Sequence, residues 1–112
     1  MDRLDQLFAR SQREIEAHAE ESADTEAGRY FINEAAQLLA ALRLWAQSQR
    51  RSDQAVREIL EAGDVVALRD AGRELWELGT KDSKAASWSV QAIAKRPSGQ
   101  LEATASYALR AL

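Results

Sequence analysis

The sequence predicts an all-α fold, and three observations point to that class. Ala and Leu supply 22 and 13 of the 112 residues, whereas Val, Ile and Thr together supply only 11. Ala and Leu have a low intrinsic cost in a helix, whereas β-branched residues favour strands. The chain has a single Pro, and its apolar residues recur at spacings of three and four, the period of one helix face. We therefore expect a compact bundle of five or six helices.

The whole chain, residues 1–112, is expected to form a single all-helical domain, because this length suits one hydrophobic core. Its 15 basic and 18 acidic side chains give a net charge of −3, and it has no Cys. Disulfides and thiolate chemistry are therefore excluded. No apolar run reaches the roughly 18 residues of a membrane span, and the first residues lack the pattern of a signal peptide. We expect a cytoplasmic protein that does not bind membranes.

The first helix is expected to carry a narrow apolar stripe on an otherwise polar surface. This stripe consists of Leu4, Leu7, Phe8 and Ile15. The polar stretch at residues 20–25 has lost the stripe and should contain a turn. It offers three N-cap residues for the next helix: Ser22, Asp24 and Thr25.

The second helix, at about residues 25–51, is expected to be the central one. Its main apolar face consists of Phe31, Ala35, Leu38, Leu39, Leu42, Trp45 and Ala46. The opposite side is also poor in charge, because Glu34 and Arg43 are the only ionised residues between Tyr30 and Gln49. A helix that is apolar nearly all round is normally covered by neighbours on several sides.

Two shorter helices should follow. The third begins at Ser52 or Asp53 and ends at Gly63, which suits a left-handed C-terminal residue. Asp64 then caps the fourth helix, in which Gly72 lies at mid-helix. Because a mid-helix Gly costs about 1 kcal/mol relative to Ala, we expect another helix to approach closely there.

The fifth helix is expected to begin at Asp82 or Ser83. It should end at Arg96, because Pro97 disfavours helical geometry in the residue before it. The sixth helix has two candidate first residues, Ser98 and Gly99, and one main stripe formed by Leu101, Ala105, Ala108, Leu109 and Leu112. In an alternative arrangement, residues 53–78 and 83–112 form two stacked helical hairpins.

The sequence offers little to catalysis or to metal binding. His18 is the only histidine, so sites that need two imidazoles are excluded within one chain. Glu14 and Glu21 share its helix face, an arrangement that could hold a metal only weakly. We interpret these three residues as a solvated face, because metal sites in bundles draw ligands from several helices. We therefore expect no metal, no cofactor and no enzymatic activity.

Nucleic-acid binding is not expected either, because it needs a continuous basic stripe. The one candidate stripe consists of Arg43, Arg50, Arg51 and Arg57. Nearby acidic residues neutralise part of it: Asp53, Glu58 and Glu61. We interpret this region as a solvated loop.

The last two helices are poor in charge, with 4 charged side chains in residues 85–112. Each has a second apolar stripe away from its main one, centred on Trp88 in the fifth helix and on Tyr107 in the sixth. Trp and Tyr are favoured at binding hot spots. In one interpretation Trp88 and Tyr107 belong to a partner-binding surface or to a homodimer interface of these two helices. In the other they are ordinary core residues.

Three stretches of the chain are rich in Ala at helical spacing: RSDQAVREILEAGDVVALRDAG from Arg51, AASWSVQAIA from Ala85 and the closing SYALRAL. Together they resemble a family of small bacterial immunity proteins associated with polymorphic toxins. Members of that family are helical, non-catalytic proteins that bind and neutralise a cognate toxin. The resemblance implies a protein inhibitor, and we carry over no functional residues from it.

The charge of the chain is unevenly distributed. Residues 1–26 hold eight acidic and three basic side chains, whereas residues 27–112 hold ten and twelve. A toxin that acts on nucleic acid would have a basic cleft, and an acidic surface would speed its encounter with such a cleft. The acidic candidates for partner contact are Glu20, Glu21 and Asp24.

The leading hypothesis is a non-catalytic protein-binding module, either an immunity- or antitoxin-like inhibitor or a small regulatory protein. One alternative is a small-molecule-binding sensor or enzyme, with a pocket inside the bundle among Trp45, Trp76 and Trp88. The other is a structural homo-oligomer with no further ligand.

Overall fold

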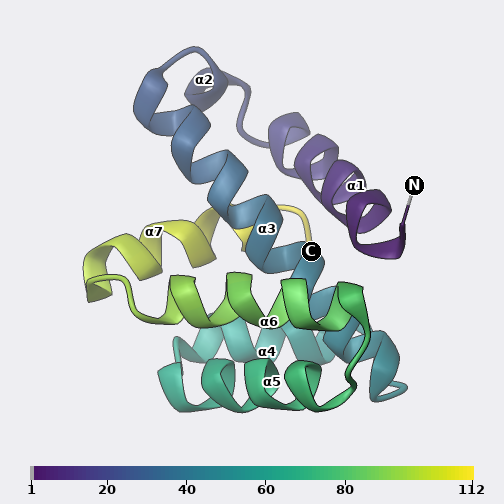
Figure 1. Cartoon of the computed structure of the whole chain (residues 1–112). Coiled ribbons are helices and arrows are strands. Elements are labelled where there is room, and N and C mark those ends of the chain that lie inside the picture. The colour runs from purple at the N-terminus through teal and green to yellow at the C-terminus, as the bar shows by residue number, and fades with distance from the viewer. Residues whose placement is uncertain (1) are drawn as a thin grey trace.

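The structure, a computed structural model, describes residues 2–112 with the exception of the Glu20 side chain. The described residues form seven helices: α1 (Arg3–Ala17), α2 (Glu20–Ala23), α3 (Glu26–Ser48), α4 (Asp53–Ala62), α5 (Val65–Glu77), α6 (Lys81–Ala94) and α7 (Ser98–Leu109) (Figure 1). No strand occurs among these residues, so the all-α class is confirmed. The structure has one helix more than the upper expectation, because the predicted turn at residues 20–25 contains the one-turn helix α2.

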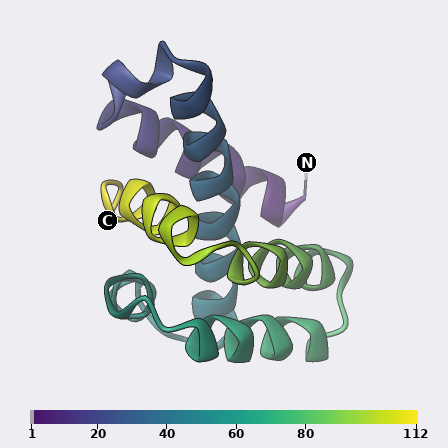
Figure 2. The ribbon, with the colours of Figure 1, turned by 90° about the vertical axis from the view of Figure 1, so that its left-hand side faces the viewer.

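Helix α3 is central to the fold, as its composition predicts. Its N-cap is Thr25, whose hydroxyl oxygen accepts a hydrogen bond from the Gly28 backbone N–H at 2.9 Å. The six consecutive positions from Leu38 to Arg43 are all buried, so this part of the helix is covered on every side. Figure 2 shows α3 running through the molecule, with α1 and α2 toward one end and α5 and α6 across the other.

Helices α1 and α2 cover different parts of α3: α1 reaches its middle and C-terminal half, where Arg3 bonds to Gln47, and α2 lies at its N-terminal end. Helix α1 uses the predicted narrow stripe, in which Leu7 and Ile15 are buried together with the polar Ser11. Helix α2 lies against the first turn of α3, where Gly28 leaves room for the backbone carbonyl of Ser22. A Cβ atom at position 28 would overlap that carbonyl, so the close contact needs glycine.

The ends of α4 and the start of α5 follow the predicted capping pattern. The Ser52 hydroxyl accepts a hydrogen bond from the Gln54 backbone N–H, and Gly63 ends α4 with φ at 61°, in the left-handed region. The Asp64 carboxylate accepts hydrogen bonds from two backbone N–H groups in the first turn of α5. These three predictions are confirmed.

Helices α5 and α6 form a close antiparallel pair at Gly72 (Figure 1). The Ser87 hydroxyl donates a hydrogen bond to the Gly72 carbonyl at 2.6 Å. A Cβ atom on Gly72 would lie 2.9 Å from Cγ of Gln91. The expected close approach of another helix at this glycine is therefore confirmed.

The boundaries of α6 differ from the prediction at both ends. Thr80, rather than Asp82 or Ser83, is the N-cap, and it exchanges hydrogen bonds with Ser83 in a capping box. This reciprocal arrangement satisfies two backbone N–H groups at once, which a cap further along the chain would leave unpaired. The helix ends at Ala94, two residues before the predicted Arg96, and α7 begins at Ser98 as predicted.

The helices do not form two consecutive hairpins. Helix α4 packs against α7, and α5 packs against α6, while all four also contact α3. The two middle helices, α5 and α6, pair with each other, and the two outer helices, α4 and α7, meet across the segment. The stacked-hairpin alternative is wrong, because α3 supplies the shared apolar surface on which all four helices lie.

We expect Leu42→Ala to lower the free energy of unfolding by about 2 to 5 kcal/mol, the range for large-to-small changes in a core. Leu42 is 0% exposed on the central helix. Urea unfolding followed by circular dichroism measures the loss. Leu78→Ala is the control: this leucine is 45% exposed, so its loss should stay below about 1 kcal/mol. A similarly small loss for Leu42→Ala would contradict the assignment of this face to the core.

Candidate functional site

Two tryptophans lie exposed on the paired helices α5 and α6. Trp88 on α6 is 72% exposed and Trp76 on α5 is 47% exposed. They border a groove of about 570 Å³, here called the tryptophan groove, which is lined by Trp76, Ser87, Trp88, Gln91, Ala92, Lys95 and Arg96. Exposed indole rings next to one another are informative, because isolated exposed apolar residues are common but grouped ones mark interaction sites.

The helical period explains why both rings face outward. On α6, Ala86, Val90 and Ile93 are buried, whereas Ala85, Trp88 and Ala92 on the other side of the helix are exposed. The predicted second stripe around Trp88 is therefore confirmed as a surface, and the interpretation of Trp88 as a core residue is wrong. On α5, Trp76 directly follows the buried Leu75, so it lies away from the core.

The tryptophan groove is bordered by cations and by no carboxylate. The Lys84 ammonium lies 5.1 Å from the centroid of the Trp76 ring, a distance suited to a cation–π contact. Lys95 and Arg96 line the groove itself, whose described lining includes no acidic residue. The surface is therefore both aromatic and positively charged, and it suits an apolar group that carries negative charge nearby.

A buried carboxylate fixes Arg96 at the edge of this groove. Glu34 on α3 is 5% exposed and accepts hydrogen bonds from Arg96 Nε at 3.0 Å and from Thr104 Oγ1 at 2.8 Å. A third, longer bond comes from the Tyr30 hydroxyl at 3.3 Å. The hydrogen bond and the charge of Glu34 raise the pKa of Arg96. The wall of the groove is thus anchored to the centre of the fold.

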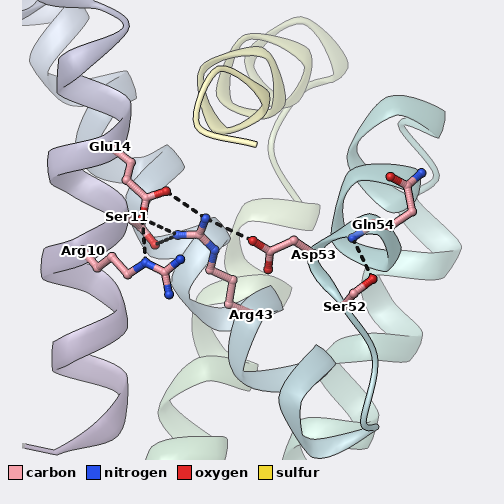
Figure 3. Close-up of polar contacts among 7 residues, drawn as sticks. All are labelled: Arg10, Ser11, Glu14, Arg43, Ser52, Asp53 and Gln54. Carbon is pink, nitrogen blue, oxygen red and sulfur yellow. Dashed lines mark hydrogen bonds and ion pairs between the residues drawn. The ribbon is translucent and has the colours of Figure 1, made fainter.

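A second buried charge, Arg43, joins α1, α3 and α4 (Figure 3). Its guanidinium donates to Ser11 Oγ at 3.1 Å and to both carboxylate oxygens of Glu14, at 3.2 and 3.1 Å, and it pairs with Asp53 at 3.4 Å. Arg43 is therefore buried and not part of the solvated loop expected around it, and the candidate basic stripe of Arg43, Arg50, Arg51 and Arg57 is incomplete. The half-buried Glu14 and the exposed Asp53 neutralise the charge of Arg43.

Neither buried charge was assigned a role from the sequence, although a signal was present. Glu34 and Arg43 are the only ionised residues in the apolar middle of the central helix. Isolated charges in such a helix are expected to have buried partners. Trp76 likewise stands one position outside the apolar stripe of its helix, which could have marked it as exposed.

The other predicted partner-binding residues lie at the far end of α3, near α2 (Figure 1). Tyr107 is half-buried: its hydroxyl donates to Ser22 Oγ at 2.8 Å, and its ring stacks on Phe31. It therefore fastens α7 to α2 and α3. Glu21 and Asp24 are exposed on and next to α2. The Glu20 side chain lies outside the part of the chain that the structure describes.

The three tryptophans do not surround one internal pocket. Trp45 is 6% exposed, and its Nε1 donates to Glu74 Oε2 at 3.2 Å. Trp76 and Trp88 lie on the surface instead. The proposed placement of a ligand pocket among the three rings is therefore wrong.

A larger hollow lies elsewhere, between α4, the start of α5 and α7. This aliphatic groove has a volume of about 630 Å³. Its apolar lining includes Leu60, Val65, Leu68, Leu101 and Leu109, and its exposed charged residues are Glu61, Arg96 and Glu102. No aromatic residue lines it.

Glu14, His18 and Glu21, which we interpret from the sequence as a solvated face, do not come together as metal ligands. Glu14 turns toward Arg43 and Arg10 rather than toward His18. Within residues 2–112, leaving out the Glu20 side chain, no group of three His, Asp or Glu residues is placed to hold a metal ion. In the same part of the chain, no helix has the length and apolarity needed to cross a bilayer.

Comparisons with protein-family models, with curated proteins and with solved structures found no significant match. The resemblance to immunity proteins therefore rests on the three stretches quoted above. One of them, AASWSVQAIA, is the part of α6 that carries Trp88.

The Glu14–Arg43 contact should make stability depend on pH. Burial raises the pKa of Glu14, but the hydrogen bonds and charge of Arg43, followed by those of Arg10, outweigh this effect, so the net pKa lies below its ordinary 4.5. A carboxylate with a lowered pKa in the folded state stabilises the protein above its unfolded pKa. That contribution is lost as the pH falls through the folded value.

We therefore expect Glu14→Gln to flatten the acidic side of the stability profile. The free energy of unfolding of the wild type should fall as the pH drops below about 4.5, the unfolded value, and the variant should fall less over the same interval. Urea unfolding at several pH values measures both slopes. Glu21→Gln removes an exposed carboxylate from α2 and should follow the wild type. Parallel profiles for Glu14→Gln and the wild type would contradict the role of Arg43.

Proposed function

We propose that this protein is a non-catalytic protein-binding module of the inhibitor type, and that the tryptophan groove is its binding surface. The observation that carries the proposal is the 72% exposure of Trp88 on a helix whose other face is fully packed. Exposing an indole ring to water is unfavourable by the free energy of its apolar area. Such a ring is typical of the anchors at protein interfaces.

The construction of the site supports binding rather than catalysis. The α5–α6 pair is held together at Gly72, where the Ser87 hydroxyl bonds directly to the backbone. Arg96 is held by the buried Glu34. The groove therefore lies on a fixed helix pair with one fixed cation, and such preorganisation lowers the entropic cost of association.

The partner is expected to present an apolar side chain surrounded by carboxylates. Lys84 and Lys95 border the two rings, whereas the charge of Arg96 is offset by the buried Glu34. An acidic surface would therefore approach faster than a basic one. An inhibitor acts in this way by covering a surface of its target. The resemblance of the Trp88 segment to immunity proteins supports the same class of function.

We expect Trp88→Glu to weaken partner binding by at least about tenfold, the loss typical of an interface anchor. Partners are captured from a lysate of the native organism with wild-type and variant baits, and the purified candidate is titrated by calorimetry. Val66→Glu is the matched control. Val66 is also exposed, at 64%, on α5 but outside the tryptophan groove, so this variant should bind like the wild type.

Two outcomes would contradict the proposal. The first is a purified partner that binds Trp88→Glu and the wild type equally. The second is a partner whose binding is lost instead when Glu21 and Asp24 are changed to Lys, because the acidic end of the molecule would then be the interface. Circular dichroism should show the same helix content for all variants, since each changed side chain is exposed.

A further inference from the structure

The aliphatic groove between α4 and α7 has the properties of a receptor for one large apolar side chain. Its volume of about 630 Å³ is bounded by apolar groups such as Leu60, Leu68 and Leu101. Two carboxylates, Glu61 on α4 and Glu102 on α7, lie exposed among its lining residues. It therefore combines an apolar floor with negative charge on both helices.

Two of the three charged side chains that line this groove, Glu61 and Arg96, have ion-pair partners within the chain. Glu61 lies 3.5 Å from the Arg57 guanidinium in an exposed pair, which is weak in water. Arg96, the one cation in the lining, is bonded to the buried Glu34. No ion pair of Glu102 is recorded among the described residues. The groove thus presents a net acidic border to an incoming group.

The surface around Trp88 is complementary to this groove. Trp88 projects from α6 at 72% exposure, and a tryptophan side chain offers about 150 to 250 Å² of area for burial. Lys84 lies one turn before it and Lys95 two turns after it, on the same side of the helix. Trp88 is thus an apolar projection between two cations, whereas the aliphatic groove is an apolar hollow bordered by carboxylates. The charges of the two surfaces are opposite in sign.

We propose that Trp88 of one copy of this chain inserts into the aliphatic groove of a second copy, with Lys84 and Lys95 facing Glu61 and Glu102. This inference goes beyond the proposed function, because the occupant is the chain itself and no other protein takes part. Arg96 lines both grooves, so the projecting surface and the receiving surface adjoin on each copy.

In this proposal each copy gives its Trp88 to one neighbour and receives the Trp88 of another, so the contact is heterologous. An open assembly then keeps one free Trp88 and one free groove, and association continues into short chains or closes into a ring. It also uses the ring that would anchor another partner. A partner at the tryptophan groove therefore competes with self-association.

The test uses two variants of the purified chain, each defective in one surface. Trp88→Glu cannot project into a groove but keeps its own groove. Glu61→Lys with Glu102→Lys loses the acidic border but keeps Trp88. Sedimentation velocity and light scattering from micromolar to millimolar concentration give the mass of each sample relative to the 12.4 kDa monomer.

We expect the wild type to grow beyond a dimer as concentration rises, while each variant alone stays monomeric. An equimolar mixture of the two variants should form a dimer and stop there, because only one intact pair of surfaces is present. Glu21→Lys with Asp24→Lys is the control. It makes the same change of charge at the other end of the molecule and should associate like the wild type.

Three results would overturn the proposal. They are a wild type that remains monomeric at millimolar concentration, a Glu61→Lys and Glu102→Lys variant that associates normally, and a mixture that stays monomeric. The second result would mean that two Trp88 surfaces meet each other symmetrically. Trp88→Ser, which adds no charge, should reproduce Trp88→Glu, and circular dichroism should confirm that all variants remain helical. None of these outcomes depends on the partner proposed above, so the two proposals fail separately.

Discussion

The fold depends on the need to cover α3 on all sides. Six consecutive residues in its middle are buried, and a helix places six successive side chains around its whole circumference. No single neighbour can cover such a helix, so the other six all contact it. The two charged side chains in its middle have partners on different helices. Arg43 pairs with residues of α1 and α4, and Glu34 pairs with residues in and just before α7. Because an unpaired buried charge is very costly, these contacts also specify which helix lies where.

The sequence predicted those features that depend on local physical chemistry. The class, the central helix, the caps at Ser52 and Asp64 and the left-handed Gly63 each follow from a few neighbouring residues, and the structure agrees with them. The helical period predicted the second stripe of α6, but it left open whether that stripe is surface or core. The cap at Thr80 was missed because several polar residues in succession can each cap a helix, and only the reciprocal bond with Ser83 decides between them.

Pairings between distant segments could not be read from the sequence. The contact of α4 with α7 joins segments about forty residues apart, and nothing local favours it over a simple hairpin. The partners of Arg43 and Glu34 are likewise separated from them along the chain, at Glu14 and Arg96. In the candidate site, the second stripe of α6 offered Trp88 as a possible surface residue. The tryptophan groove itself could not be predicted, because it forms where α5 and α6 meet. The position of its cations depends on that pairing.

The three tryptophans occupy three different environments, and this gives the protein a set of intrinsic optical reporters. Trp45 is sheltered from water and bonded to Glu74, so its emission reports on the integrity of the core. Trp76 lies beneath the Lys84 ammonium, and Trp88 is open to solvent, so dissolved quenchers such as iodide or acrylamide reach them first. Emission from the exposed rings shifts to shorter wavelength when they leave water. Unfolding and binding can therefore be followed separately in the unmodified chain, without an attached dye.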